Sequence, residues 1–202
     1  LVNNNPAHSA FMQARMEQLA AQRKSGALRH RWVNYAAISV PFKRAVLVAE
    51  DARFASHSGV DWRAIQRAWM TNLERDSIAF GGSTITMQLA KNLFLSGRRS
   101  YWRKAQEVLI ALMLELALSK ERILELYLNL AQWGENVFGA QAAARYYFGV
   151  NASALTLKQA ARLAAMLPRP AYYARNRDSD WLSRRARVIA ADTVNVRLPE
   201  QP

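Results

Sequence analysis

Polar and charged residues interrupt four otherwise apolar stretches of this sequence, and their types fit chemistry at a glycosidic carbon. The four sets are Glu50 with Asp51, Gln88 with Lys91, Arg103 with Glu107, and Lys120 with Asn129. A carboxylate flanked by apolar residues has a raised pKa and can act as a base near neutral pH. Two separated carboxylates in a groove are the equipment of glycosyl chemistry, in which one manages a proton and the other the developing charge. Several cations nearby indicate a leaving group that carries phosphate.

The segment 81–92, Gly-Gly-Ser-Thr-Ile-Thr-Met-Gln-Leu-Ala-Lys-Asn, has the pattern of a loop followed by a helix. Ser83 is the predicted N-cap, because its hydroxyl can accept a hydrogen bond from a free N–H of the first turn. Thr84, Gln88 and Lys91 then lie near one face, which suits a phosphate-bearing ligand beside a helix N-terminus. The alternative is a plain glycine-hinged turn before an ordinary amphipathic helix. A phosphate-binding P-loop is excluded, since no Gly-Lys-Ser/Thr ending follows.

The composition limits the classes of fold and partner. The chain has 202 residues, of which 51% are apolar, and this fits one domain, or one domain with a small lobe. It has no cysteine, so neither disulfides nor thiolate metal sites are expected. The formal net charge of +13 favours a polyanionic partner: nucleic acid, an anionic membrane or a pyrophosphate substrate. No window of about 18 apolar residues predicts a membrane-spanning helix, and no signal peptide is recognisable.

Helical periodicity dominates the chain and predicts an all-α fold, with one short strand at 31–35. The segment 101–115 is apolar nearly all round beyond Glu107, which predicts a central, buried helix. Glu107 lies where the inner wall of that helix turns polar. The stretch 74–82 is charged and then glycine-rich, so a small flexible lobe is expected within residues 74–104.

The order of these motifs resembles the bacterial peptidoglycan glycosyltransferases, glycosyltransferase family 51, in their monofunctional membrane-anchored form. The resemblance covers roughly residues 38–190. Its motifs are Glu50-Asp51-x-x-Phe54-x-x-His57-x-Gly59, Gly81-Gly82-Ser83-Thr84-Ile85-x-x-Gln88-x-x-Lys91-Asn92, Arg103-Lys104-x-x-Glu107 and Lys120-x-x-Ile123-Leu124-Glu125-x-Tyr127-Leu128-Asn129. Four motifs in this order are highly specific, whereas any one alone is weak. The chain departs from the family at Met87, where a first glutamine usually precedes Gln88, and this puts the contact of that glutamine in doubt.

The resemblance implies a fold similar to lysozyme, an α-helical head with a small flexible jaw lobe near the membrane. It also implies that the protein polymerises lipid II into the β-1,4-linked glycan strands of the cell wall. The growing strand, held on undecaprenyl pyrophosphate, would be the donor, and the 4-hydroxyl of an incoming lipid II the acceptor. The reaction would invert the anomeric centre and release undecaprenyl pyrophosphate.

The resemblance also assigns roles to individual residues. Glu50 would be the general base that removes the acceptor proton. Glu107 would steady the donor side by orienting basic groups, by binding a divalent cation such as Mg²⁺ or Mn²⁺, or by supporting the sugar. The expected substrate-binding residues are Asp51, Ser83, Thr84, Gln88, Lys91, Arg103, Lys104, Lys120, Asn129 and Arg184, of which Lys91, Arg103 and Lys120 would neutralise the pyrophosphate. Arg185 is the alternative to Arg184. Phe54, His57 and Gly59 would shape the cleft, and Glu125 and Tyr127 would serve packing and capping.

Three segments are expected along the chain. Residues 1–37 would be an N-terminal segment that follows a missing membrane anchor, since the sequence opens with Leu1 and reads as a fragment or processed product. Residues 38–192 would be the peptidoglycan glycosyltransferase domain, and 193–202 a C-terminal tail. The resemblance implies the periplasmic face of the bacterial inner membrane and no required cofactor. The implied partners are lipid II, the nascent glycan chain, the anionic membrane surface and other cell-wall synthesis and division proteins, with no nucleic acid.

Two other functions compete with this interpretation. A lysozyme-like lytic enzyme uses a similar helical scaffold and a lone catalytic glutamate, but its neutral leaving group does not require the cations Lys91, Arg103 and Lys120. A basic module that binds nucleic acid or lipid would show salt-sensitive binding without turnover, and it leaves Glu50 and Glu107 unexplained.

Overall fold

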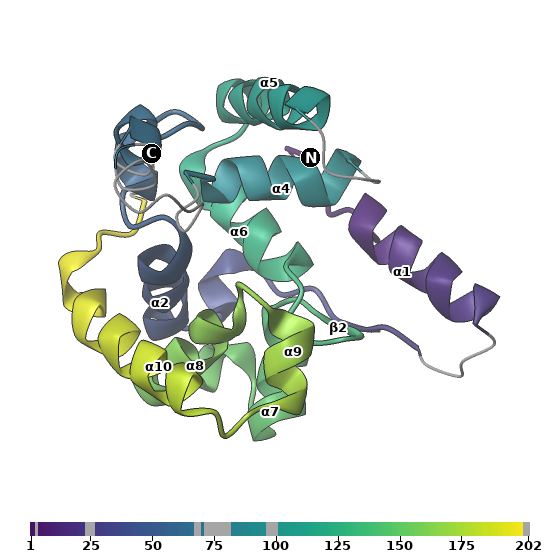
Figure 1. The fold of residues 1–202 in the computed structure, drawn as a ribbon, viewed down its shortest axis with the longest axis vertical. Helices are drawn as coiled ribbons and strands as arrows, with labels where there is room; N and C mark the ends of the chain where they lie inside the picture. Colours follow the sequence, from purple (N-terminus) through teal and green to yellow (C-terminus); the bar gives the residue numbers. More distant parts are fainter. Residues whose placement is uncertain (3, 23–26, 67–69, 71–81, 96–100, 200–202) are drawn as a thin grey trace.

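The computed structural model describes the whole chain except residues 3, 23–26, 67–69, 71–81, 96–100 and 200–202, and it is built largely from helices (Figure 1). The α-helices are α1 (Ala10–Ala21), α2 (Val40–Glu50), α4 (Ile85–Phe94), α5 (Tyr101–Ala117), α6 (Lys120–Leu130), α7 (Ala140–Phe148), α8 (Leu157–Met166), α9 (Pro170–Arg175) and α10 (Asp180–Asp192). Short 3₁₀ turns occupy Tyr35–Ala37, Phe54–Ser56, Ala152–Ala154 and Thr193–Asn195. The predicted all-α class is confirmed.

A two-stranded parallel sheet joins the N-terminal part of the chain to its middle. Strand β1 (Arg29–His30) pairs with β2 (Val137–Phe138), and Arg29 lies opposite Val137. The strand predicted at 31–35 is therefore misplaced, because those residues leave the sheet and enter the 3₁₀ turn that starts at Tyr35. The side chain of Asn129 on α6 fixes this crossing: its Oδ1 accepts from the N–H of Val33 at 2.9 Å, and its Nδ2 donates to the Val33 carbonyl at 2.9 Å.

The core includes α6, which packs chiefly on α4, and a second group of helices in which α8 packs against α2 and α10 (Figure 1). Ile123, Leu124, Leu126 and Leu128 are fully buried along it. On α8, Ala160, Ala161, Ala164 and Ala165 are buried where α2 and α10 pack against it. Small side chains let helix backbones approach closely.

The prediction that residues 101–115 form the central, buried helix is wrong. Helix α5 lies at one end of the molecule and packs chiefly on α4 (Figure 1). Its inner face carries Glu107, Ala111 and Leu114, as expected, but Trp102 is 82% exposed and Leu116 is 90% exposed on the outer side. An apolar helix face indicates that the face is shielded from water. The sequence pattern does not show whether another part of the protein or a lipid shields it. Among the described helices, none is long and apolar enough to cross a bilayer.

Two parts of the predicted jaw lobe, residues 74–81 and 96–100, lie outside the described residues. The described part consists of 82–95, which carries α4, and the first turn of α5. The predicted hinge at Gly81 also lies outside this part of the chain.

Candidate active site

The carboxylate of Glu50 lies at the C-terminal end of α2 and is oriented by a neutral amide. Its Oε2 accepts a hydrogen bond from Nε2 of Gln88 at 2.6 Å, and Oε1 of Gln88 accepts in turn from the hydroxyl of Tyr127 at 3.1 Å. Burial raises the pKa of Glu50, while the Gln88 hydrogen bond and the charges of Arg185 and Lys91 oppose that rise. The carboxylate is thus fixed in direction and poised toward the protonated form.

Glu50 opens into a cavity of about 240 Å³ between the end of α2 and the start of α4. The cavity is lined by Val48, Ala49, Glu50, Asp51, Ala52, Arg53, Asp61, Ala64, Gly82, Ser83 and Thr84. It therefore brings together residues from the first two predicted motifs, which are more than thirty positions apart in sequence.

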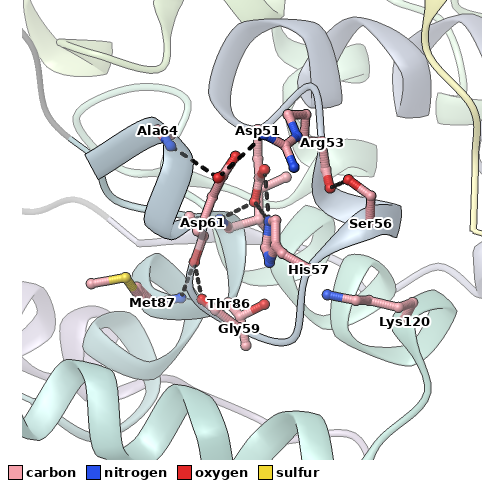
Figure 2. Close-up of polar contacts among 12 residues, drawn as sticks. Asp51, Arg53, Ser56, His57, Gly59, Asp61, Ala64, Thr86, Met87 and Lys120 are labelled. Carbon is pink, nitrogen blue, oxygen red and sulfur yellow. Dashed lines mark hydrogen bonds and ion pairs between the residues drawn. The ribbon is translucent and has the colours of Figure 1, made fainter. Parts of the chain in front are cut away.

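Asp51 joins the end of α2 to the start of α4 (Figure 2). Its Oδ2 accepts the first N–H of α4, from Ile85, at 3.1 Å, and both carboxylate oxygens lie 3.0 Å from Nε2 of His57. The side chain is buried with these partners. Asp51 therefore has a structural role: the carboxylate satisfies a donor at a helix N-terminus and fixes the loop that carries His57. Its predicted contact with substrate stays a prediction, and the residue lines the Glu50 cavity.

The N-cap of α4 is Thr84, and the prediction of Ser83 is wrong by one residue. The Thr84 hydroxyl accepts from the N–H of Met87 at 3.2 Å and donates to the carbonyl of Gly59 at 2.5 Å, so one side chain caps the helix and ties down a loop. Gly59 has φ +86°, and a Cβ there would lie 3.2 Å from the carbonyl of Ala111, which explains the glycine. The side chain of Met87 is buried in the core and leaves the polar contacts near Glu50 to Gln88.

Glu107 is oriented by cations instead of an amide. The side chain is 5% exposed on the inner face of α5, with Oε2 at 3.0 Å from the ammonium of Lys104 and Oε1 at 3.6 Å from Nε of Arg103. The same ammonium donates to the hydroxyl of Ser83 at 2.8 Å, which connects this cluster to the rim of the Glu50 cavity. The structure thus brings Ser83, Arg103, Lys104 and Glu107 together, and their roles toward the substrate stay predictions.

The surroundings of Glu107 do not match a divalent-cation site. Both carboxylate oxygens face cations, and positive side chains disfavour a metal ion at that position. Within the described residues, no group of three or more His, Cys, Asp or Glu side chains could hold a metal. Of the roles predicted for Glu107, orienting basic groups agrees with its partners, and metal binding does not.

Lys120 does not join the cations around Glu107. Its ammonium lies 2.7 Å from Oε1 of Glu115 and 4.4 Å from the centre of the Phe54 ring, and in Figure 2 it points toward the loop of His57. Glu115 also accepts from the hydroxyl of Thr86 at 2.6 Å. Lys120 lines a separate cavity of about 570 Å³ together with Arg53 and Arg197. The two cavities adjoin, because Ala52 and Arg53 line both of them.

Two further predicted substrate-binding residues, Asn129 and Arg184, line neither cavity. Asn129 is fully buried, and its amide is occupied by backbone groups of Val33 and Glu125, so it braces the fold and does not reach either cavity. Arg184 is exposed on α10, whereas its neighbour Arg185 donates to the carbonyl of Ala49 at 3.4 Å, one residue from Glu50. The structure therefore favours Arg185, the alternative of the pair.

Sequence reasoning left two functional neighbours without a role at the site. Tyr127 was assigned to packing, although its hydroxyl orients Gln88, and a tyrosine on an apolar buried face needs a polar partner. Glu115 received no role from the sequence. An acid inside an apolar helix five residues before a lysine was the available signal for its pair with Lys120.

Comparison with known proteins places the chain in a family. The sequence model of the transglycosylase family matches residues 16–194. A biosynthetic peptidoglycan transglycosylase of Nitrosospira multiformis is 52% identical over 195 residues, which cover 96% of this chain and 85% of the relative. Proteins of the same name from Methylobacillus flagellatus and Laribacter hongkongensis are each 52% identical, over 94% and 92% of this chain and 83% and 82% of their own lengths. The chain therefore belongs to the transglycosylase family.

Proposed function

We propose that this enzyme is a peptidoglycan glycosyltransferase that polymerises lipid II into β-1,4-linked strands, with inversion at the donor carbon and undecaprenyl pyrophosphate as leaving group. The observation that carries the proposal is the Glu50 carboxylate, which has a raised pKa, is aimed by Gln88 and opens into a cavity beside cations. The names of relatives about half identical to this chain give the substrate class.

In the proposed reaction, Glu50 accepts the proton of the 4-hydroxyl of the incoming lipid II. The freed oxygen forms a bond to C1 of the donor sugar as the bond between C1 and the pyrophosphate oxygen breaks, and the electron pair leaves with the pyrophosphate. A base with a raised pKa suits this task, because it holds the accepted proton more firmly than an ordinary carboxylate does. Gln88 aims the carboxylate, and Tyr127 fixes Gln88.

The leaving pyrophosphate gains charge during this step, and cations stabilise it there. Lys91 and Arg185 act on Glu50 electrostatically, and Lys104 reaches the rim of the same cavity through Ser83. Glu107 orients Lys104 and Arg103 so that their charges are in place before the substrate binds. The adjoining cavity at Lys120, Arg53 and Arg197 is a second cationic surface for lipid-linked phosphate.

The lytic alternative is less well supported by this arrangement. A glycosidase must protonate a neutral leaving oxygen, and it gains little from several cations around the departing group. Transfer from a pyrophosphate donor requires those cations and needs no acid at the leaving oxygen. The cation-rich surroundings of Glu107 and Ser83 thus favour transfer over hydrolysis.

The outer face of α5 supports action at the membrane surface on the periplasmic side. Trp102, Leu109, Met113 and Leu116 are exposed on it, and Phe94 at the end of α4 is exposed as well. Apolar side chains with an exposed tryptophan are typical of surfaces that dip into the boundary of a bilayer. A lipid-linked substrate is met at that boundary, which places the cleft near its supply.

The decisive experiment incubates the protein with lipid II in detergent and separates the products by gel electrophoresis. We expect long glycan strands from the wild type and from Glu17→Gln, an exposed control on α1, and almost none from Glu50→Gln. Purified sacculi are incubated in parallel. Release of muropeptides without strand formation from lipid II would identify a lytic enzyme, and undiminished polymer from Glu50→Gln would remove Glu50 from the mechanism.

A further inference from the structure

Five exposed arginines surround two adjoining cavities between β1, α7 and α9. They are Arg29, Arg31, Arg145, Arg175 and Arg177. The smaller cavity, about 260 Å³, has Arg31 and Arg145 in its lining, the larger, about 490 Å³, has Arg175, and Arg29 and Tyr146 line both. We call this surface the arginine groove. It shares no lining residue with the cavities at Glu50 and Lys120.

Neutral groups hold these arginines in place. The guanidinium carbons of Arg29 and Arg177 lie 5.4 and 5.2 Å from the centre of the exposed Tyr146 ring, and Arg177 lies 4.8 Å from that of Tyr147. Arg145 donates to the carbonyl of Gly149 at 3.0 Å and to the side-chain oxygen of Asn151 at 2.6 Å. Aromatic faces and carbonyls fix the direction of a guanidinium without cancelling its charge.

The nearby acids are occupied elsewhere. Glu135 lines the larger cavity but pairs with Arg15 at 3.1 Å, and Asp178 pairs with Arg162 at 3.7 Å. Within the described part of the chain, none of the five groove arginines forms an ion pair with a carboxylate. Positive charges that repel one another are thus preorganised beside open space, and an anion that entered would meet little reorganisation cost.

We propose that the arginine groove binds an extended, carboxylate-rich segment of a partner protein. The cations are spread along two cavities and do not converge on one point, which fits carboxylates spaced along a chain better than a single phosphate. Helix α7, which lines the groove, lies at the end of the molecule opposite α5 along its longest axis (Figure 1), so a membrane that contacts the apolar face of α5 is on the other side of the molecule from this wall of the groove. The choice of a polypeptide over nucleic acid rests on the proposed function, which places the enzyme outside the cytoplasm.

The test measures the fluorescence anisotropy of a labelled peptide of alternating glutamate and glycine as protein is added at moderate salt. We expect saturable binding by the wild type and roughly tenfold weaker binding by the double variant Arg29→Gln/Arg175→Gln. The matched control, Lys158→Gln/Arg187→Gln, removes the same charge from exposed positions on α8 and α10, and we expect less than about a twofold change. Tyr146→Phe should keep the affinity, and Tyr146→Leu should lower it several-fold, because only the first keeps the ring that orients Arg29 and Arg177.

Equal weakening by the groove and control double variants would mean that only net charge matters, and it would overturn the proposal. Displacement of the peptide by vesicles of phosphatidylglycerol, with the groove variants losing vesicle binding, would identify a lipid surface instead. Polymerisation of lipid II by the wild type is measured on the same preparation. Polymer without peptide binding overturns the groove alone, whereas peptide binding without polymer overturns the proposed function.

Discussion

The two carboxylates of the site, Glu50 and Glu107, have opposite surroundings. Glu50 ends α2 and hydrogen-bonds to the neutral amide of Gln88, so burial raises its pKa. Glu107 lies on the inner face of α5 between Lys104 and Arg103. Glu107 lies 3.0 Å from the ammonium of Lys104 and 3.6 Å from the guanidinium of Arg103, whereas the hydrogen bond to Glu50 comes from a neutral amide.

This difference assigns different chemistry to the same residue type. A carboxylate that holds its proton more firmly can exchange it with a substrate, whereas one that lies between an ammonium and a guanidinium group orients those cations. Glu50 is therefore the group for proton transfer and Glu107 the group for arranging charge.

The largest effect is expected from Glu50→Gln. The amide keeps the size and can still accept from Gln88, but it cannot take the acceptor proton, so we expect kcat to fall about 10³-fold. The measurement is the initial rate of lipid II polymerisation at saturating substrate, with thermal unfolding to show that the variant is folded. A loss smaller than that of Glu107→Gln would invert the comparison.

Glu107→Gln should cost less, roughly 10- to 100-fold in kcat/KM, because it loosens cations and removes no reacting group. A double-mutant cycle sharpens the point. Lys104→Gln and Glu107→Gln should be clearly non-additive, since both remove the same contact of 3.0 Å, whereas Lys104→Gln and Glu50→Gln should combine nearly additively. Additivity of the first pair would show that Glu107 does not act through Lys104.

The sequence predicted which residue types gather at the candidate site better than it predicted how the helices that carry them pack. Glu50, Gln88, Ser83, Arg103 and Glu107 were found from type and spacing, because motifs on helices preserve which side chains share a face. The choice between Arg184 and Arg185 was out of reach: neighbours on a helix point about 100° apart, and only the packing of α10 on α8 and α2 decides which one faces Ala49.

Other differences between the predictions and the structure have similar physical causes. Ser83 and Thr84 are both good N-cap residues. Thr84 caps the helix in the structure, where the carbonyl of Gly59 also accepts a hydrogen bond from its hydroxyl. Asn129 looked like a polar group for substrate, but a backbone crossing more than ninety residues away in sequence uses it fully. The apolar pattern of α5 was identified correctly, yet a pattern does not show whether protein or lipid covers a face.

Gln88→Leu should move the acidic limb of the pH–rate profile. The hydrogen bond from Gln88 lowers the pKa of Glu50, so its loss leaves burial less opposed and raises that pKa further. A base works only when ionised, and activity should therefore be lost at a higher pH on acidification than in the wild type, with a few-fold loss near neutral pH. Lys104→Gln, on the Glu107 side, should lower the rate without moving the limb. If the acidic limb of the pH–rate profile stays in place in Gln88→Leu, Gln88 does not influence the pKa of Glu50.

The smallest effect concerns stability, and here the two carboxylates should differ in sign. The folded-state pKa of Glu50 lies above its ordinary value of 4.5, so between those two values the folded chain binds more protons than the unfolded one. The free energy of unfolding therefore falls as pH rises through this window, and at neutral pH the ionised carboxylate is a cost. Glu50→Gln removes that cost and should raise Tm at pH 7 but leave it almost unchanged at pH 4; each kcal/mol corresponds to about 2–4 °C in a chain of this size.

Glu107→Gln should lower Tm at pH 7, because it leaves Lys104 and Arg103 facing each other without the carboxylate between them. Differential scanning calorimetry of both variants at the two pH values decides the matter, and a fall in Tm for Glu50→Gln at pH 7 would show that Glu50 stabilises the fold and is not held there for its chemistry.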